Sequence, residues 1–154
     1  MKYWLMKSEP STFSIDDLAS APRRTTCWDG VRNYQVRNML RDEMVVGDLA
    51  FMYHSSCDEP GIVGVIEIAK PGYPDHTAFD RKHEHYDAAS QPEAPRWYMV
   101  DVRLKQRFSR VISLDELRRH ESKQLREMLL LKRGNRLSIT PVDASHWKFI
   151  LSLQ

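Results

Sequence analysis

The sequence predicts an α+β fold built on a mostly antiparallel sheet that is curled or barrel-like and flanked by helices. Segments rich in β-branched and aromatic residues dominate the middle of the chain, and helix-start signals gather toward both ends. The two kinds of segment do not alternate regularly, which argues against a doubly wound parallel sheet. The chain of 154 residues has the length of one ordinary globular domain, and we expect a single domain over residues 1–154.

The N-terminal part is expected to form one strand and two helices. Residues 2–6, KYWLM, alternate in character as a first strand does. Residues 14–20 begin with a capping-box sequence, in which a serine hydroxyl can accept a hydrogen bond from a free backbone amide of a short helix. Residues 22–26 are expected to form a loop. Asp29 is then expected to cap an amphipathic helix over about Val31–Glu43.

The middle of the chain carries most of the strand signals. Residues 49–55 and 61–68 are rich in apolar and β-branched side chains and are expected to pair as antiparallel strands. Residues 70–95 contain four prolines and little periodicity, so one long loop is predicted there. Residues 96–108 form a long predicted strand with apolar side chains on one face and basic side chains on the other.

The C-terminal part is expected to be mainly helical. Residues 113–120 begin with a second capping-box sequence, and residues 122–133 are expected to continue as a helix that Gly134 ends. A last short strand is predicted at residues 137–139. The stretch from Thr140 onward is expected to start a C-terminal helix whose apolar side chains dock on the sheet.

The charge of the chain is unevenly distributed. The net charge is +2, but residues 1–95 carry 10 Lys or Arg against 15 Asp or Glu, whereas residues 96–136 carry 12 against 5. On one predicted strand Arg103, Lys105 and Arg107 alternate onto the same face. A basic face of this kind could contact phosphates, although a solvated charged face is the more common origin of such a run.

No segment predicts a membrane span or a secretory signal. The chain has no run of about 18 apolar residues, and Lys2, Lys7 and Glu9 interrupt the N-terminal stretch where a secretory signal needs unbroken apolarity. We therefore expect a cytoplasmic protein, nuclear if the source is eukaryotic, with no membrane partner. The two cysteines, Cys27 and Cys57, are expected to be free thiols.

Signals for catalysis, metal binding and cofactors are weak. Cys27 or Cys57 could act as a nucleophile with His54, but a free cysteine is more often a small buried apolar residue. The polar segment 75–87 crowds histidines and carboxylates, including a His-Glu-His sequence, yet it lacks the fixed framework that metal ligands need. A glycine-rich phosphate loop is absent. We therefore predict no metal, no cofactor and no catalytic residues.

The segment CWDGVRNYQVRN, residues 27–38, indicates a different chemistry. Its tryptophan, Trp28, follows a polar loop and belongs to no apolar period, so a pocket wall and a core position are equally compatible with it. Recognition of a nucleobase needs a flat ring for stacking and fixed donors and acceptors at the base edge, without proton transfer. Ser8, Asn33 and Ser55 could supply such edge contacts.

Several longer motifs occur in a recognisable order. They are YWLMKSEP, WDGVRNYQVRNMLRD, VGDLAFMYHSS, PGIVGVIEI, YPD, PRWYMVDV and LSITPV followed by a tryptophan. In this order they closely resemble the EVE domain, which belongs to the PUA-like group and is related to YTH and ASCH domains. The resemblance covers essentially the whole chain. It implies a PUA-like pseudo-barrel and a non-catalytic reader that binds nucleic acid, DNA or RNA, through a modified cytosine or adenine held in an aromatic pocket.

The resemblance also implies which residues form the site. In the related YTH readers a Lys-Ser pair in the first strand precedes a tryptophan that forms one pocket wall, and Lys7, Ser8 and Trp28 hold the like positions here. The base pocket is therefore expected to comprise Lys7, Ser8, Glu9, Trp28, Asn33, Tyr53, His54, Ser55 and Phe79. The phosphates are expected to be contacted by Arg32, Arg37, Arg103, Lys105 and Arg107.

Two points stay open at the level of the sequence. The second pocket wall could come from Tyr73, Phe79 or Tyr86, because the loop that supplies a tryptophan in YTH domains has none here. The function could also be that of an enzyme acting on a modified base or nucleotide, for which Glu9 and Lys7 are the legible acid–base candidates. A protein-interaction module without a nucleic-acid role is the other alternative.

Overall fold

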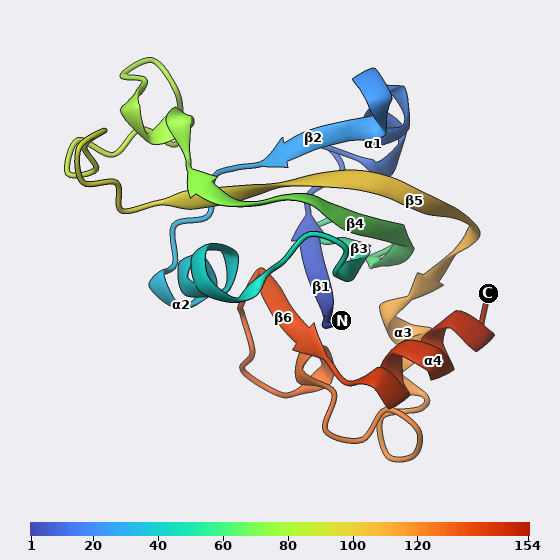
Figure 1. The fold of residues 1–154 in the computed structure, drawn as a ribbon. Helices are drawn as coiled ribbons and strands as arrows, with labels where there is room; N and C mark the ends of the chain where they lie inside the picture. Colours follow the sequence, from blue (N-terminus) through green and yellow to red (C-terminus); the bar gives the residue numbers. More distant parts are fainter.

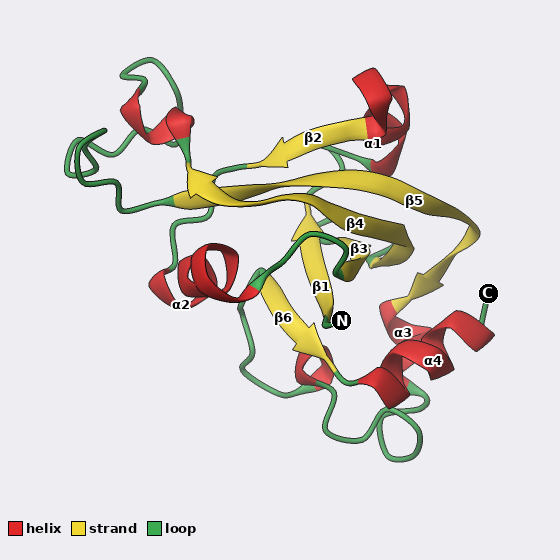
Figure 2. Cartoon of the chain, in the orientation of Figure 1, coloured by secondary structure: helices red, strands yellow, loops and turns green.

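A six-stranded sheet forms the centre of the computed structural model, which describes residues 1–154 (Figure 1, Figure 2). The strand order is β2-β5-β4-β3-β1-β6, and neighbouring strands run antiparallel except β1 and β3. This open, curled sheet with few helices confirms the predicted α+β fold. The strands are β1 (Tyr3–Ser8), β2 (Thr25–Trp28), β3 (Leu49–His54), β4 (Gly61–Pro74), β5 (Tyr98–Ser113) and β6 (Ile139–Val142).

Short helices cover the margins of the sheet. Ser14 and Ser113 cap the first and third of them by accepting hydrogen bonds from the amides of Asp17 and Glu116, as their sequences predict. None of the helices combines the length and apolarity needed to span a membrane. The helices are α1 (Ile15–Ser20), α2 (Tyr34–Asn38), α3 (Leu114–Arg118) and α4 (Ala144–Ser152), with 3₁₀ turns η1 (Pro22–Arg24), η3 (His76–Phe79) and η4 (Leu129–Leu131) and a π-helix η2 (Met39–Glu43).

The sheet separates two apolar clusters, because successive side chains of a strand point to opposite faces. On one face Trp4 of β1 packs in a cluster that includes Leu18 of α1. On the other face Leu5 belongs to a cluster with Phe51 of β3 and Trp147 of α4, whose rings stack with centroids 3.9 Å apart. Both faces of β1 are therefore buried, and this strand lies in the interior of the molecule.

β4 and β5 are the longest strands, and they bend. Their pairing contains several register shifts, which mark β-bulges and increase the local twist. Between them the chain passes through η3 and a run of turns; we call this segment, residues 75–97, the excursion. The excursion lies at one end of the two long strands, and α3 and α4 lie toward the other end (Figure 1).

Two predictions for the segment before β3 are wrong. The second helix begins only at Tyr34, because Asn33 and not Asp29 caps it, by accepting the N–H of Val36 at 3.0 Å. Residues 22–26, expected to be a loop, contain η1 and the start of β2. This short strand has no apolar periodicity, and its pairing with β5 defines it. A single-sequence pattern does not contain that long-range contact.

Four predictions for later segments also need correction. The loop predicted at residues 70–95 begins within β4, because residues 70–74 continue the pairing with β5, and it includes η3. The helix predicted at residues 122–133 is replaced by turns and η4, since its apolar side chains pack individually over the second cluster and tertiary packing overrides their helix propensity. The last strand, β6, overlaps the predicted residues 137–139 only at Ile139. Residues 140–142, expected to start the C-terminal helix, pair with β1 instead, and the helix begins at Ala144.

Candidate functional site

A cavity of about 360 Å³ lies where the ends of β1 and β2 approach each other. These strands are fifth and first in the strand order, so the curl of the sheet, and not strand pairing, makes them neighbours. A turn of the excursion forms another part of the wall. The lining residues are Lys7 and Ser8 of β1, Thr12 and Phe13 after it, residues 26–29 at the end of β2, and residues 83–85 of the excursion.

Trp28 lines this cavity and also belongs to the core. The residue is only 8% exposed and packs in the same apolar cluster as Trp4. The two roles that its sequence context left open are therefore combined in one side chain. An aromatic ring held by core packing at the wall of a cavity is a preorganised stacking surface for a flat ligand.

Lys7 brings a positive charge to the cavity. The residue is half-buried, and burial lowers the pKa of its ammonium group, because a charged group loses hydration there. The hydroxyl of the next residue, Ser8, donates a hydrogen bond to the carbonyl of Phe13 at 2.6 Å, which fixes the backbone that follows β1. Lys7 and Trp28 therefore place a cationic hydrogen-bond donor and an aromatic ring in the lining of one cavity.

The carboxylate of Asp75 connects the segment after β2 to the excursion. Asp75 is 0% exposed, and its Oδ2 accepts hydrogen bonds from the N–H of Gly30 at 2.8 Å and from the guanidinium of Arg32 at 3.0 Å. Its Oδ1 accepts the N–H and the hydroxyl of Thr77. Burial alone would raise the pKa of Asp75, but these hydrogen bonds, those from Thr77 foremost, hold it below the usual value of a carboxyl group.

Arg32 extends this connection to the cavity wall. Its guanidinium donates hydrogen bonds to the carbonyl of His85 at 2.6 and 3.2 Å and lies over the ring of Trp97. Gly30 contacts the same histidine: its φ is +80°, and a Cβ at this position would lie 2.5 Å from the His85 ring. The left-handed backbone favours glycine here, and any larger residue would also displace the His85 ring. The Asp-Gly-Val-Arg segment and the His-Glu-His turn are therefore fixed against each other.

Three polar residues of the CWDGVRNYQVRN segment make structural contacts. The guanidinium of Arg32 donates hydrogen bonds to the carboxylate of Asp75 and to backbone carbonyls, so its N–H groups are used within the protein. Asn33 is exposed and uses its side-chain oxygen to cap α2. Arg37 donates to the carbonyl of Arg96 at 2.7 Å. Arg32, Asn33 and Arg37 thus all make contacts within the protein, and Asn33 is absent from the cavity lining.

The remaining predicted pocket residues lie away from this cavity. His54 lines a second cavity, of about 240 Å³, and its Nε2 accepts the N–H of Ile15 at 3.1 Å. Tyr53 is buried in the second apolar cluster. Three further residues, Glu9, Ser55 and Phe79, are absent from the lining of the first cavity.

The basic face predicted on β5 is present and partly neutralised. Arg103 and Lys105 are exposed and flank Glu67, with N–O separations of 3.6 and 3.7 Å. Arg107 is paired with Asp16 and lines the second cavity. Exposed ion pairs contribute little stability in water, so these cations can exchange a carboxylate partner for a phosphate.

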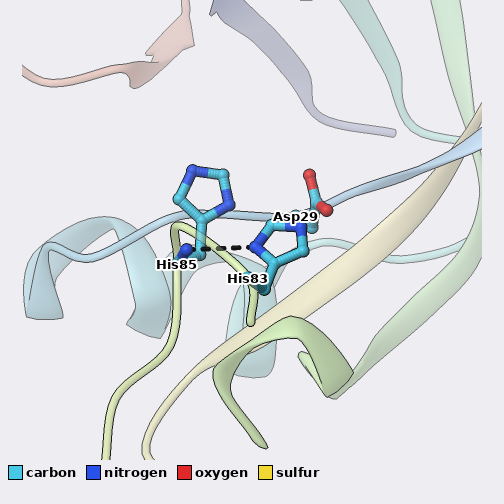
Figure 3. Close-up of side chains that lie close together, drawn as sticks. All are labelled: Asp29, His83 and His85. Carbon is cyan, nitrogen blue, oxygen red and sulfur yellow. Dashed lines mark hydrogen bonds between the residues drawn. The ribbon is translucent and has the colours of Figure 1, made fainter. Parts of the chain in front are cut away.

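The predicted base pocket omits eight lining residues, among them Phe13, Asp29, His83 and His85. Figure 3 shows the last three, from two segments that are far apart in the sequence, close together in space. The His-Glu-His sequence was a visible signal, but its position beside Asp29 depends on the contacts of Asp75 and Arg32. Tyr73, Phe79 and Tyr86, the candidates for a second wall, are absent from the lining, which contains Phe13 and two imidazole rings instead.

The lining of the cavity includes one thiol, that of Cys27, together with the imidazoles of His83 and His85. Burial, followed by the nearby charges of Asp29 and Asp101, raises the pKa of this thiol. The thiol is therefore protonated and a poor nucleophile at neutral pH. His54, the base considered for it, lies in the second cavity.

Residues 2–153 match the family described as the EVE domain. The chain belongs to the EVE domain family. Human thymocyte nuclear protein 1 is 46% identical over 167 residues, which cover 99% of this chain and 73% of that protein. The protein of the same name from Danio rerio is 46% identical over 166 residues, covering 98% of this EVE domain and 71% of the relative.

Solved structures with high similarity come from human and bacterial proteins. The crystal structure of human THYN1 in complex with DNA containing 5-methylcytosine superposes with a TM-score of 0.94 at 46% identity and covers 99% of this chain and 97% of that one. The crystal structure of a Pseudomonas syringae protein gives a TM-score of 0.92 at 46% identity, with 98% of each chain covered. The arrangement of this EVE domain is therefore shared by proteins of distant organisms.

Replacement of Arg32 by Met tests the connection through Asp75. The change leaves a buried carboxylate without its cation, and we expect the free energy of unfolding to fall by about 3 kcal/mol, the lower end for a broken buried pair because Arg32 is partly exposed. Urea denaturation measures the loss. Arg103→Met, which removes an exposed ion pair, is the matched control and should change stability by less than about 1 kcal/mol. Equal losses in the two variants would contradict a structural role of this pair.

Proposed function

We propose that this EVE domain is a non-catalytic reader of modified cytosine in DNA. In this proposal the modified base leaves the duplex stack, enters the cavity of about 360 Å³, stacks on Trp28 and receives a hydrogen bond from Lys7. One observation carries the proposal: human THYN1, which has the same fold at 46% identity, was crystallised with DNA that contains 5-methylcytosine. The Lys7, Ser8 and Trp28 positions implied by the family resemblance line one cavity here.

The dimensions and chemistry of the cavity support a single base as the ligand. Its volume lies near the lower end of the range of about 300–1,000 Å³ that is common for small-molecule sites. Trp28 and Phe13 offer apolar surface for an aromatic ring and a methyl group. The ammonium group of Lys7 offers N–H donors, which suit the oxygen and ring-nitrogen acceptors on the pairing edge of cytosine.

The two alternative functions have less support. An enzyme that acts on the base needs an activated nucleophile or an acid–base pair in the cavity, and the raised pKa of Cys27 works against the first. Glu9, the acid considered from the sequence, is exposed and outside the cavity lining. A protein-interaction module needs neither the cavity nor a half-buried lysine within it.

We also propose that the protein acts in the compartment that holds the DNA. That compartment is the cytoplasm in a bacterium and the nucleus in a eukaryote, and the name of thymocyte nuclear protein 1 agrees with the second case. The basic face formed by Arg103, Lys105 and Arg107 would then lie along the phosphates of the bound duplex.

Substitution of Lys7 by Met separates a ligand contact from a structural role. The variant should bind a duplex with one 5-methylcytosine roughly 10- to 100-fold more weakly, the loss expected when hydrogen bonds to a charged group are removed. Its stability should be unchanged or higher, because the fold no longer has to bury an ammonium group. Fluorescence anisotropy with methylated and unmethylated duplexes, together with thermal unfolding, measures both quantities.

The matched control for this experiment is Lys148→Met. Lys148 is exposed on α4, outside the cavity, and its replacement changes the net charge by the same amount. The proposal is wrong if Lys7→Met and Lys148→Met bind the methylated duplex equally well, or if the wild type does not distinguish it from the unmethylated one.

Replacement of Arg103, Lys105 and Arg107 together by Gln tests the predicted phosphate contacts. We expect weaker binding to methylated and unmethylated DNA by the same factor, because phosphate contacts carry no base information. The slope of log affinity against log salt should decrease by up to about 2.7, or about 0.9 per lost contact. An unchanged slope in a salt titration would show that this face does not contact DNA.

A further inference from the structure

Three potential metal ligands meet on the cavity wall in an arrangement that base reading does not require. One carboxylate oxygen of Asp29 and one ring nitrogen from each of His83 and His85 lie within 4.8 Å of one another. Figure 3 shows the three side chains gathered in the same space. The two imidazole rings are 4.9 Å apart between centroids and are tilted by 36°.

We propose that Asp29, His83 and His85 form a binding site for a divalent transition-metal ion. Two imidazole nitrogens and one carboxylate oxygen are donors that suit Zn²⁺ and related ions, and three protein ligands leave at least one coordination position for water or another ligand. Bonds of about 2.0–2.2 Å in tetrahedral geometry place ligand atoms roughly 3.3–3.6 Å apart. Side-chain movements of about 1 Å therefore bring the three ligand atoms from their present spacing to the spacing that an ion requires.

The two segments that carry these ligands are held in place. Arg32 bonds the carbonyl of His85 and at the same time the buried carboxylate of Asp75. The N–H of His83 donates to the carbonyl of Asp80 at 2.9 Å, which closes the turn that carries both histidines. The sequence predicted no metal site because segment 75–87 alone lacks a fixed framework. Long-range contacts supply that framework, and the third ligand comes from the other segment.

The ring nitrogens of the two histidines differ in their present bonding. Nδ1 of His85 is buried and has no hydrogen-bond partner, so its bonding capacity is unused. Nδ1 of His83 accepts the N–H of His85 at 3.0 Å, and its neutral ring therefore carries the proton on Nε2. Coordination through Nδ1 of His83 replaces this hydrogen bond with the metal, whereas coordination through Nε2 moves the proton to Nδ1 and thereby also breaks the bond. The turn must adjust in both cases, and we expect the site to tighten as the ion binds.

The local charge is compatible with a dication. Asp29 supplies one carboxylate, and Glu84, whose Oε1 lies 3.9 Å from Nε2 of His85, supplies a second negative charge nearby. Lys7 lines the same cavity, and its positive charge opposes binding of a cation. This inference does not rest on the proposed function, because the ion can be tested without DNA.

Isothermal titration of the whole chain with Zn²⁺ alone, at neutral pH, tests the site. We expect one ion per chain. Asp29→Asn and His83→Asn should each weaken Zn²⁺ binding at least about tenfold, because removing a metal ligand lowers the affinity more than removing a contact that supports a ligand. His76→Asn is the matched control, because His76 is an exposed histidine of the same excursion, outside the cluster. The site is refuted if Asp29→Asn and His83→Asn bind Zn²⁺ as tightly as the His76→Asn control.

A measurement on the wild type makes the result independent of how the variants fold. In long-range ¹H–¹⁵N spectra of the histidine rings, Zn²⁺ should shift the signals of His83 and His85 and leave those of His76 unchanged. Shifts distributed over all the histidines, or absent from His83 and His85, would overturn the proposal. Its failure would not affect the Lys7→Met experiment on DNA, so the two proposals can fail separately.

Discussion

The buried carboxylate of Asp75 is the contact on which the candidate site depends. It has lost its hydration and is stable only because Gly30, Arg32 and Thr77 donate hydrogen bonds to it. Those partners come from two segments, one after β2 and one in the excursion, and no strand pairing joins these segments directly. Arg32 passes the constraint on to the carbonyl of His85. The hydrogen-bonded carboxylate of Asp75 therefore positions, through Arg32, the part of the cavity wall that residues 83–85 form.

The curl of the sheet supplies the other half of the site. Lys7 and Trp28 belong to strands that are four places apart in the strand order, yet both line the same cavity. Register shifts between β4 and β5 mark the bulges at which the two long strands bend. Because the cavity lies between strands that do not pair, its width depends on the degree of curl.

The sequence predicts more of the fold than of the site, and particular residues show why. Strand alternation and serine caps are local patterns, so β1, α1 and the fold class could be recognised from them. Lys7 and Trp28 line one cavity, and the resemblance could single them out because they lie in long family motifs. Asn33 has the side chain needed either to contact a base or to cap a helix, and composition does not distinguish the two. His83 and His85 reach the cavity only through contacts between distant segments, which no periodicity encodes.

The most direct test of a base-reading cavity is to map where the protein senses the modification. Amide and indole ¹H–¹⁵N spectra can be recorded with two duplexes that differ only in one methyl group on a cytosine. The largest differences between the two complexes should fall on Lys7, Ser8, Trp28 and residues 83–85, which line the cavity of about 360 Å³. Differences centred on His54 and the second cavity, or along β5, would contradict the account.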